Sequence, residues 1–344
     1  MILNNLYYLN GLFKRFHKLG FLNTINEFKD YYNQYMNLLK KISYIPNTKY
    51  KAFLVFNYCK ITSLVPDIDR NFLIEIVPKM FAKNYLAHKI NPLNEKWKLV
   101  EKNKFYKILK DNEIPFPKTY FYTKNGKFYN IEDKEITDLI SFENIEMFVK
   151  SVNGSGGADV DIITFKSNQK YSDNLIFQEM LKSHKNIYKL CPVKAVQTLR
   201  INTYYTLHNE IEYDSYFIKL PPPNAISDNS YTGCIMVSID PNTGKLQRTG
   251  FTKYGNKIGH QNITSHYNSD IKFENYQIPF WKETKILIKK LHSIFPKLRF
   301  IGWDIAITNE GPVVIEGNSV GDILFEQLVS GPFYNKKLIQ ENIN

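Results

Sequence analysis

The 344-residue sequence lacks several features that would assign a protein to a class. No apolar run approaches the roughly 18 to 20 residues that a membrane-spanning helix needs. The opening segment, MILNNLYYLNGLFKRFHKLG, has neither the apolar core nor the cleavage site of a signal peptide. Cys59, Cys191 and Cys234 are scattered, and the seven histidines form no cluster, which excludes a disulfide framework and a zinc-type spacing. We therefore expect a cytoplasmic protein with reduced thiols.

The chain does have a large apolar content and an uneven distribution of charge. Hydrophobic residues make up 43% and aromatic residues 15%, which indicates a folded protein large enough for two or three subdomains. Residues 1–110 hold 19 Lys and Arg against 7 Asp and Glu, and this surplus of 12 equals the net charge of the whole chain. A basic surface suits an anionic membrane, nucleic acid or an acidic polymer, whereas a solvated lysine-rich surface needs no partner. Both interpretations stay open.

Hydrophobic periodicity predicts an α+β protein. Residues 1–95 are predicted to be mainly helical, and residues 97–112 and 283–295 repeat with a helical period. Between these two helices the pattern mostly alternates, as it does in half-buried strands. The clearest predicted strands are residues 145–151, 159–165, 175–181, 195–207 and 211–220.

Residues 300–319, FIGWDIAITNEGPVVIEGNS, predict a β-hairpin. The segments on both sides of Asn309-Glu310-Gly311 alternate, and these three residues favour a turn. A hairpin that pivots about Glu310 pairs Thr308 with Pro312. One face should then be a hydrophobic floor made of Ile305, Ile307, Val313 and Ile315.

The other face of this hairpin carries oxygen ligands. In the same register Asp304 lies opposite Glu316, and Asn318 shares the face of Glu316. Carboxylate and amide oxygens suit Mg²⁺. Two hypotheses stay open, a metal site at these three residues or a solvated hairpin whose acids face water.

A glycine-rich segment, FVKSVNGSGGADVD at residues 148–161, joins two predicted strands. Its glycines would let backbone N–H groups approach a phosphate, and Lys150 would add a positive charge. The segment is not a Walker A motif, because the GK[ST] end is missing and no helix follows. A phosphate-binding loop and a flexible surface turn are both consistent with it.

Arg200 lies in the middle of a predicted strand, where it shares a face with Thr198, Asn202 and Tyr204. An arginine in such a place is rarely left unpaired. It either forms a salt bridge or faces an anionic ligand, and Lys219 near the end of the next strand is a similar case.

Six segments, taken in order, resemble the ATP-grasp superfamily and most of all its sugar-transfer-associated branch, whose members occur with genes for surface-polysaccharide synthesis. The resemblance spans about residues 100–327. It implies two α+β subdomains that sandwich ATP, residues 96–181 with the glycine-rich loop and 182–344 with the metal site, after a basic, mainly helical region at 1–95. The segments are VEKNKFYKILKDNEIPFP, FVKSVNGSGG, FQEML, QTLRINTYY, SDNSYTG and GWDIAITNEGPVVIEGNS.

The resemblance also implies roles for single residues. Lys104 and Lys150 would contact the nucleotide phosphates, and Asp304, Glu316 and Asn318 would bind Mg²⁺. The closing loop would contain Ser155, Gly156 and Gly157, and the adenine would contact Gln178, Glu179, Met180 and Leu181.

One position departs from the pattern of several amino-acid ligases in the superfamily. They carry an arginine two residues before the metal-binding aspartate, and this chain has Gly302 there. Arg200 or Lys219 would have to supply that catalytic charge from a neighbouring strand.

The implied activity is that of an ATP- and Mg²⁺-dependent ligase. It would activate a carboxylate as an acyl-phosphate and join it to an amine or another nucleophile, in cell-surface polysaccharide or envelope modification. The alternative is an ATP-grasp kinase that phosphorylates a sugar or another small acceptor, and a membrane- or nucleic-acid-binding protein is a third hypothesis. The expected partners are a small-molecule or glycan-linked acceptor and an anionic surface at the inner face of the membrane; nucleic acid is not favoured.

Overall fold

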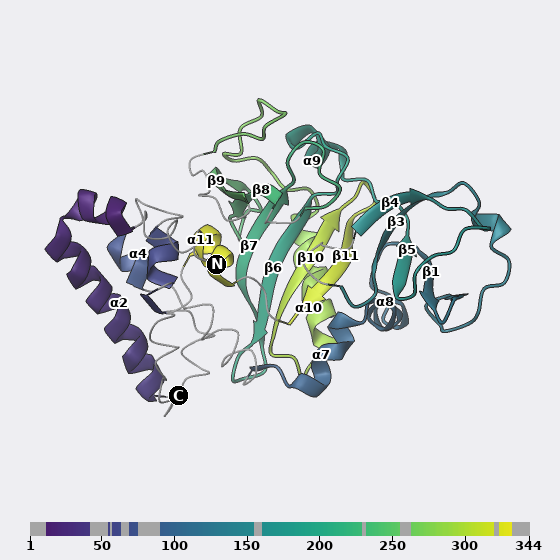
Figure 1. Ribbon diagram of the computed structural model, residues 1–344, viewed down its shortest axis with the longest axis horizontal. Helices are drawn as coiled ribbons and strands as arrows, with labels where there is room; N and C mark the ends of the chain where they lie inside the picture. The colour runs from purple at the N-terminus through teal and green to yellow at the C-terminus, as the bar shows by residue number, and fades with distance from the viewer. Residues whose placement is uncertain are drawn as a thin grey trace.

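The computed structural model describes residues 12–41, 54–55, 57–62, 69–74, 90–154, 160–228, 232–254, 263–319 and 323–331. These residues form two antiparallel sheets that lie side by side, and the N-terminal helices lie beyond the larger sheet (Figure 1). In this part of the chain, no helix is long and apolar enough to cross a membrane.

The N-terminal region is helical where the structure describes it. Residues 12–19 form one helix, followed by α2 (Phe21–Lys41) and, further along the chain, α4 (Arg70–Ile74). Gly20 separates the first two helices with a φ of +82°, an angle that glycine adopts without steric cost.

A buried ion pair holds these helices together. Arg15 donates from Nε and Nη2 to the two oxygens of Glu27 at 2.9 and 2.6 Å. Tyr58 donates its hydroxyl to the same carboxylate at 2.7 Å. Burial and the Glu27 charge raise the pKa of Tyr58, so this hydroxyl keeps its proton. The pair therefore has its partners in place and serves as a structural anchor.

The predicted helix at residues 97–112 is in fact two helices, α7 (Leu93–Val100) and α8 (Lys102–Asp111). Glu101 lies between them in an extended conformation. The cause is tertiary, because the backbone N–H of Lys102 donates to the carbonyl of Val152 at 3.1 Å instead of continuing the helix. This contact attaches the start of α8 to the end of a strand.

The smaller sheet has five strands in the order β2-β1-β5-β3-β4. One face covers an aromatic cluster that includes Phe121, Phe165 and Phe177, against which the short 3₁₀ helix η2 (Ile140–Phe142) packs through Phe142. Strand alternation places Phe148 and Lys150 on the other face. The strands are β1 (Thr119–Lys124), β2 (Lys127–Tyr129), β3 (Glu146–Ser151), β4 (Val160–Thr164) and β5 (Leu175–Gln178).

The larger sheet has six strands in the order β11-β10-β6-β7-β8-β9. Trp303 on β10 and Ile288 and Leu291 on α10 belong to one buried core, which also includes Phe105 of α8. The elements are α9 (Lys185–Leu190), β6 (Thr198–Tyr205), β7 (Ile211–Leu220), β8 (Thr232–Ile239), β9 (Leu246–Tyr254), α10 (Trp281–Ser293), β10 (Phe300–Ile307), β11 (Pro312–Asn318) and α11 (Ile323–Ser330).

The register of the β10–β11 hairpin is confirmed at the ligands and wrong at the turn. Asp304 faces Glu316 as predicted, but Ile307 and not Thr308 faces Pro312. Thr308 and Gly311 bond to each other through their backbones, which leaves a two-residue turn. A bulge next to Asp304 then restores the predicted register.

The bulge also changes which side chains of β11 face the core. Val314 is fully buried, whereas Val313 and Ile315 are only half-buried. The prediction of Val313 and Ile315 as part of the hydrophobic floor was therefore wrong.

Candidate active site

A cluster of buried charges lies on one face of the larger sheet, with Asp304 at its centre. Arg200 on the neighbouring strand pairs with Asp304 in register and donates from Nε and Nη2 to its two oxygens at 2.7 and 3.0 Å. Lys219 on β7 places its Nζ 3.2 Å from the same carboxylate. Of the two alternatives left open for Arg200, the structure shows the salt bridge.

These cations keep Asp304 ionised. Burial alone would raise the pKa of Asp304, but the charges of Arg200 and Lys219 outweigh it and hold the pKa well below its usual range. Burial likewise acts to lower the pKa of Lys219, and the charges of Asp228 and Asp304 raise it above its usual value. The cluster therefore holds fixed charges at neutral pH.

The three predicted metal ligands lie together. Asn318 donates its amide N–H to Glu316 at 3.1 Å and reaches Asp304 at 3.5 Å. Burial, followed by the Asp304 charge, raises the pKa of Glu316. Within the described residues no set of three His, Cys, Asp or Glu side chains surrounds a metal position, so the donor set here is two carboxylates and one amide. Such oxygen ligands fit Mg²⁺, which also keeps several waters in its shell.

Two acidic residues that the sequence analysis did not single out complete the cluster. Asp228 accepts from Thr198 and from Lys219, the latter at 3.0 Å. Glu326 on α11 accepts from Arg200 Nη1 at 3.1 Å and from Asn202 Nδ2 at 2.9 Å. Asp228 lies in the SDNSYTG segment, and Glu326 is the single charge in the apolar helix ILFEQLVS, a signal that could have identified it.

Gly302 has a clear structural reason in this cluster. A Cβ at this position would lie 2.7 Å from Asn202 Oδ1 and 3.1 Å from Arg200 Nη1. The side chains of β6 therefore occupy the space above Gly302, and a larger residue there would displace Arg200. The guanidinium of Arg200 on β6 therefore fills this space, and only glycine fits at position 302 without moving it.

Lys150 lies between the two sheets. Its Nζ donates to Tyr106 Oη at 2.9 Å, and Tyr106 donates in turn to the backbone carbonyl of Ile315 at 2.7 Å. Burial lowers the pKa of Lys150 to about 8, although Glu316 and Asp304 act in the opposite direction. The ammonium is therefore poorly solvated and close to the carboxylates of the larger sheet.

The predicted adenine segment and Lys150 share a cavity of about 90 Å³. Gln178, Glu179, Met180 and Leu181 line it from the smaller sheet and its connector. Phe148 and Ile315 supply apolar walls, and Thr198 and Asp228 close it from the larger sheet. The cavity thus lies between the connector at residues 178–181 and Asp228 of the charged cluster.

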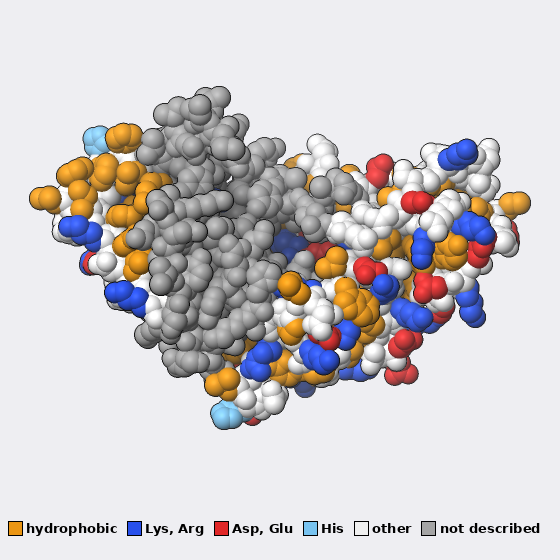
Figure 2. All heavy atoms as spheres, turned by 60° about the horizontal axis from the view of Figure 1, so that its bottom comes forward, with side chains coloured by type: hydrophobic (Ala, Val, Ile, Leu, Met, Phe, Trp, Pro, Cys, Tyr) orange, Lys and Arg blue, Asp and Glu red, His pale blue; other side chains and the backbone are white. Residues whose placement is uncertain are grey.

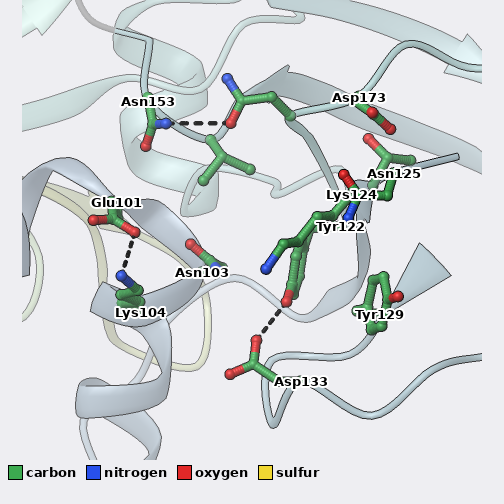
Figure 3. Close-up of a pocket in the computed structure, with 13 residues that line it drawn as sticks. Glu101, Asn103, Lys104, Tyr122, Lys124, Asn125, Tyr129, Asp133, Asn153 and Asp173 are labelled. Carbon is green, nitrogen blue, oxygen red and sulfur yellow. Dashed lines mark hydrogen bonds and ion pairs between the residues drawn. The ribbon is translucent and has the colours of Figure 1, made fainter. Parts of the chain in front are cut away.

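The structure does not bring Lys104 to this group. Lys104 is exposed and pairs with Glu101 at 2.6 Å. It lines a different cavity of about 620 Å³ between the start of α8 and the smaller sheet, into which Lys124 points (Figure 3). Lys102 is buried instead and donates to the carbonyl of Gly154, where the glycine-rich loop begins, at 2.5 Å. Lys102 is one helical turn before Tyr106, so both face the site.

The role predicted for Lys104 is therefore not supported by its position, and Lys102 is the better placed lysine. Sequence reasoning missed it because the break at Glu101, which turns α8 relative to α7, depends on a tertiary hydrogen bond. The predicted loop residues Ser155, Gly156 and Gly157 lie outside the described residues.

A model of the sugar-transfer associated ATP-grasp family matches residues 81–172 and 164–341. The chain belongs to this family. Its ATP-grasp fold explains the order of the elements, with the glycine-rich loop in the first sheet and the acidic hairpin in the second. No curated protein sequence matches significantly.

Several solved structures are similar to this ATP-grasp chain at low identity. N5-carboxyaminoimidazole ribonucleotide synthetase from Thermotoga maritima is 12% identical with a TM-score of 0.39, and the match covers 74% of this chain and 56% of that one. D-alanine–D-alanine ligase from Bacillus anthracis is 11% identical with a TM-score of 0.42, covering 74% and 70%. L-amino acid ligase from Bacillus licheniformis is 13% identical with a TM-score of 0.42, covering 77% and 53%. The chain thus matches little more than half of the first and third proteins.

Proposed function

We propose that the protein is an ATP-dependent ligase that activates a carboxylate and joins it to an amine or another nucleophile. One observation carries the proposal: the buried Lys150, the connector at residues 178–181 and Asp228 line one cavity between the two sheets, and Lys219 links Asp228 to Asp304 of the β10–β11 hairpin. Membership of the sugar-transfer associated ATP-grasp family supports ATP as the nucleotide.

Asp304, Glu316 and Asn318 would hold Mg²⁺, which supplies positive charge to the β- and γ-phosphates. Lys150 and Lys102 would bring further positive charge to the triphosphate from the smaller sheet and α8. These charges lower the barrier because they are fixed before the reaction begins.

The proposed reaction has two steps. A carboxylate oxygen of the first substrate attacks the γ-phosphorus, the bond to the β-phosphate oxygen breaks, and ADP leaves. The amine of the second substrate then attacks the carbonyl carbon of the acyl-phosphate, the amide forms, and inorganic phosphate leaves. The amine proton passes to solvent or to a nearby carboxylate.

Arg200 and Lys219 are the side chains that we propose stabilise the charge of these transition states. Both are held beside Asp304, and Arg200 crosses above Gly302. Their positive charge lies next to the proposed metal ligands, so it would act on the transferred phosphoryl group. This arrangement would replace the arginine that several relatives carry at position 302.

Incubation of the protein with Mg²⁺-ATP and panels of acids and amines tests this function. A ligase releases ADP and free phosphate in equal amounts, and only when acid and amine are both present. A kinase, which is the second candidate because the buried cations also suit a phosphorylated acceptor, releases ADP and leaves the phosphate on the acceptor. ADP release that no acid or acceptor stimulates would contradict both.

The biological setting is also part of the proposal. The family description points to sugar transfer, so we propose that the acid or amine belongs to a cell-surface polysaccharide or envelope precursor. The positive charge of residues 1–110 supports work at an anionic membrane on the cytoplasmic side.

A further inference from the structure

Four apolar side chains surround the break between the first two described helices, and we call them the apolar tip: Phe13, Phe16, Phe21 and Leu22. Phe13, Phe21 and Leu22 are 62%, 61% and 74% exposed. Phe16 contacts the rings of Phe13 and Phe21 at centroid distances of 6.4 and 5.2 Å. Figure 2 shows hydrophobic side chains gathered over these N-terminal helices.

The turns of the two helices next to the tip have polar side chains inside and apolar side chains outside, although α2 further along buries Tyr31, Tyr35 and Leu39. Their buried positions include Arg15, Thr24 and Glu27, which are polar and satisfied inside. The large apolar groups of the same turns point outward. In a helix that faces only water and its own core, the apolar stripe faces inward. The exposed apolar groups of the tip therefore form a surface on which an apolar partner can pack.

The charge around the tip indicates which surface fits. Residues 1–26 contain no Asp or Glu. The first acidic residue, Glu27, is buried and bound to Arg15. Lys14 and Lys18 are exposed beside the apolar side chains. Asp69 lines a cavity together with Lys18, but residues 1–26 themselves contribute only basic charge. Exposed aromatic rings beside lysines complement a lipid bilayer that carries negative headgroups.

We propose that the apolar tip docks on an anionic membrane. The rings of Phe13 and Phe21 and the side chain of Leu22 enter the boundary between headgroups and acyl chains, and Lys14 and Lys18 approach lipid phosphates. This inference identifies the surface behind the membrane setting proposed above. It does not depend on which reaction the cleft catalyses.

The experiment is co-sedimentation of the full chain with large vesicles of phosphatidylcholine, alone or with about one third phosphatidylglycerol. We expect binding to the anionic vesicles about tenfold tighter than to the neutral ones, and weaker at high salt. The double variant Phe13→Ser/Leu22→Ser should lose about tenfold in affinity for the anionic vesicles. The control Ile140→Ser/Leu207→Ser changes two side chains that are 78% and 61% exposed elsewhere, and it should bind like the wild type.

Two results would overturn the docking proposal. One is equal binding of the tip and control variants to anionic vesicles. The other is a change in oligomeric state, without any change in vesicle binding, when the tip is mutated, because this would assign the tip to a second copy of the chain. Acceptor-dependent ADP release of the tip variant in solution should match the wild type, so failure of the membrane proposal and failure of the ligase proposal are distinguishable.

Discussion

Two buried arginine–carboxylate pairs in this protein have nearly the same geometry and different surroundings. Arg15 and Glu27 join the N-terminal helices with contacts of 2.9 and 2.6 Å, and Arg200 and Asp304 join two central strands at 2.7 and 3.0 Å. The first pair is completed by the neutral hydroxyl of Tyr58. The second is surrounded by further charges on four elements.

The comparison shows what separates an architectural pair from a site. One arginine and one carboxylate balance each other's charge, although burying them costs desolvation. Charged side chains lie near both pairs, since Lys18, Asp69 and Arg70 line a cavity with Arg15 and Glu27. What distinguishes the surroundings of Asp304 is that Glu316 has a raised pKa and that Lys150 is buried with a lowered one. Such opposed shifts in a cleft are typical of a ligand site.

The largest effect on ATP turnover should come from Glu316, the carboxylate that belongs to neither arginine pair. Glu316→Gln keeps the shape of the side chain and removes one proposed ligand of Mg²⁺. We expect Mg²⁺-dependent ATP turnover to fall by at least about 100-fold. Thermal unfolding without metal should not shift to lower temperature, since the change removes repulsion with Asp304. Turnover close to wild type would exclude Glu316 as a ligand.

Breaking the architectural pair should affect stability and leave the site intact. Glu27→Ala leaves Arg15 buried without its carboxylate, and the expected loss is about 3–5 kcal/mol in the free energy of unfolding. Denaturant unfolding measures this loss, and ATP binding to the remaining folded protein should be unchanged. A Glu27 variant that unfolds normally but fails to bind ATP would reverse the roles of the two pairs.

Lys150 is buried and Lys104 is exposed, so substituting each in turn compares a buried with an exposed positive charge in ATP binding. Lys150→Ala should weaken ATP binding by about 1.5–3 kcal/mol, because a charge-assisted contact with phosphate is lost. Lys104→Ala, the matched control, should change the affinity by less than about 0.5 kcal/mol. Titration calorimetry gives both values. An equal loss of ATP affinity in both variants would show that Lys104 also contacts the nucleotide.

The protonation of Lys150 adds a pH dependence to the same experiment. Burial lowers its pKa to about 8, so the free protein holds the charged form below that pH and loses it above. The affinity of the wild type for ATP should therefore decrease from pH 8 towards pH 9.5, and the Lys150→Ala variant should show no such decrease.

The smallest effect concerns the acid on α11. Glu326→Gln retains a hydrogen-bond acceptor for Asn202 and loses the charge that holds Arg200 Nη1. Turnover should fall by about tenfold or less, with the KM for ATP unchanged, if Glu326 positions Arg200. Steady-state kinetics at several ATP concentrations distinguish this from weakened nucleotide binding, which would raise KM instead.

The sequence predicted the ligand face of the hairpin because alternation and register are local properties. Asp304 and Glu316 could be paired by counting from the turn, and the identities of the strands around Arg200 and Lys219 followed from the same periodicity. The turn itself was wrong by one residue, since a bulge is set by packing and has no signal in this pattern.

Other parts of the site depend on contacts between distant segments. The position of Lys102 follows from a backbone bond to Val152, fifty residues away in sequence. Glu326 reaches Arg200 only because α11 returns across the sheet. Composition could not indicate either contact, and the outward orientation of Phe13 and Leu22 runs against the usual amphipathic pattern.

The most direct test of the central claim is the affinity for a non-hydrolysable ATP analogue with and without Mg²⁺. The charged cluster predicts binding that is at least about tenfold tighter with Mg²⁺, and loss of that difference in Glu316→Gln. Equal affinity with and without Mg²⁺ in the wild type, or an unchanged Mg²⁺ effect in the variant, would contradict the account.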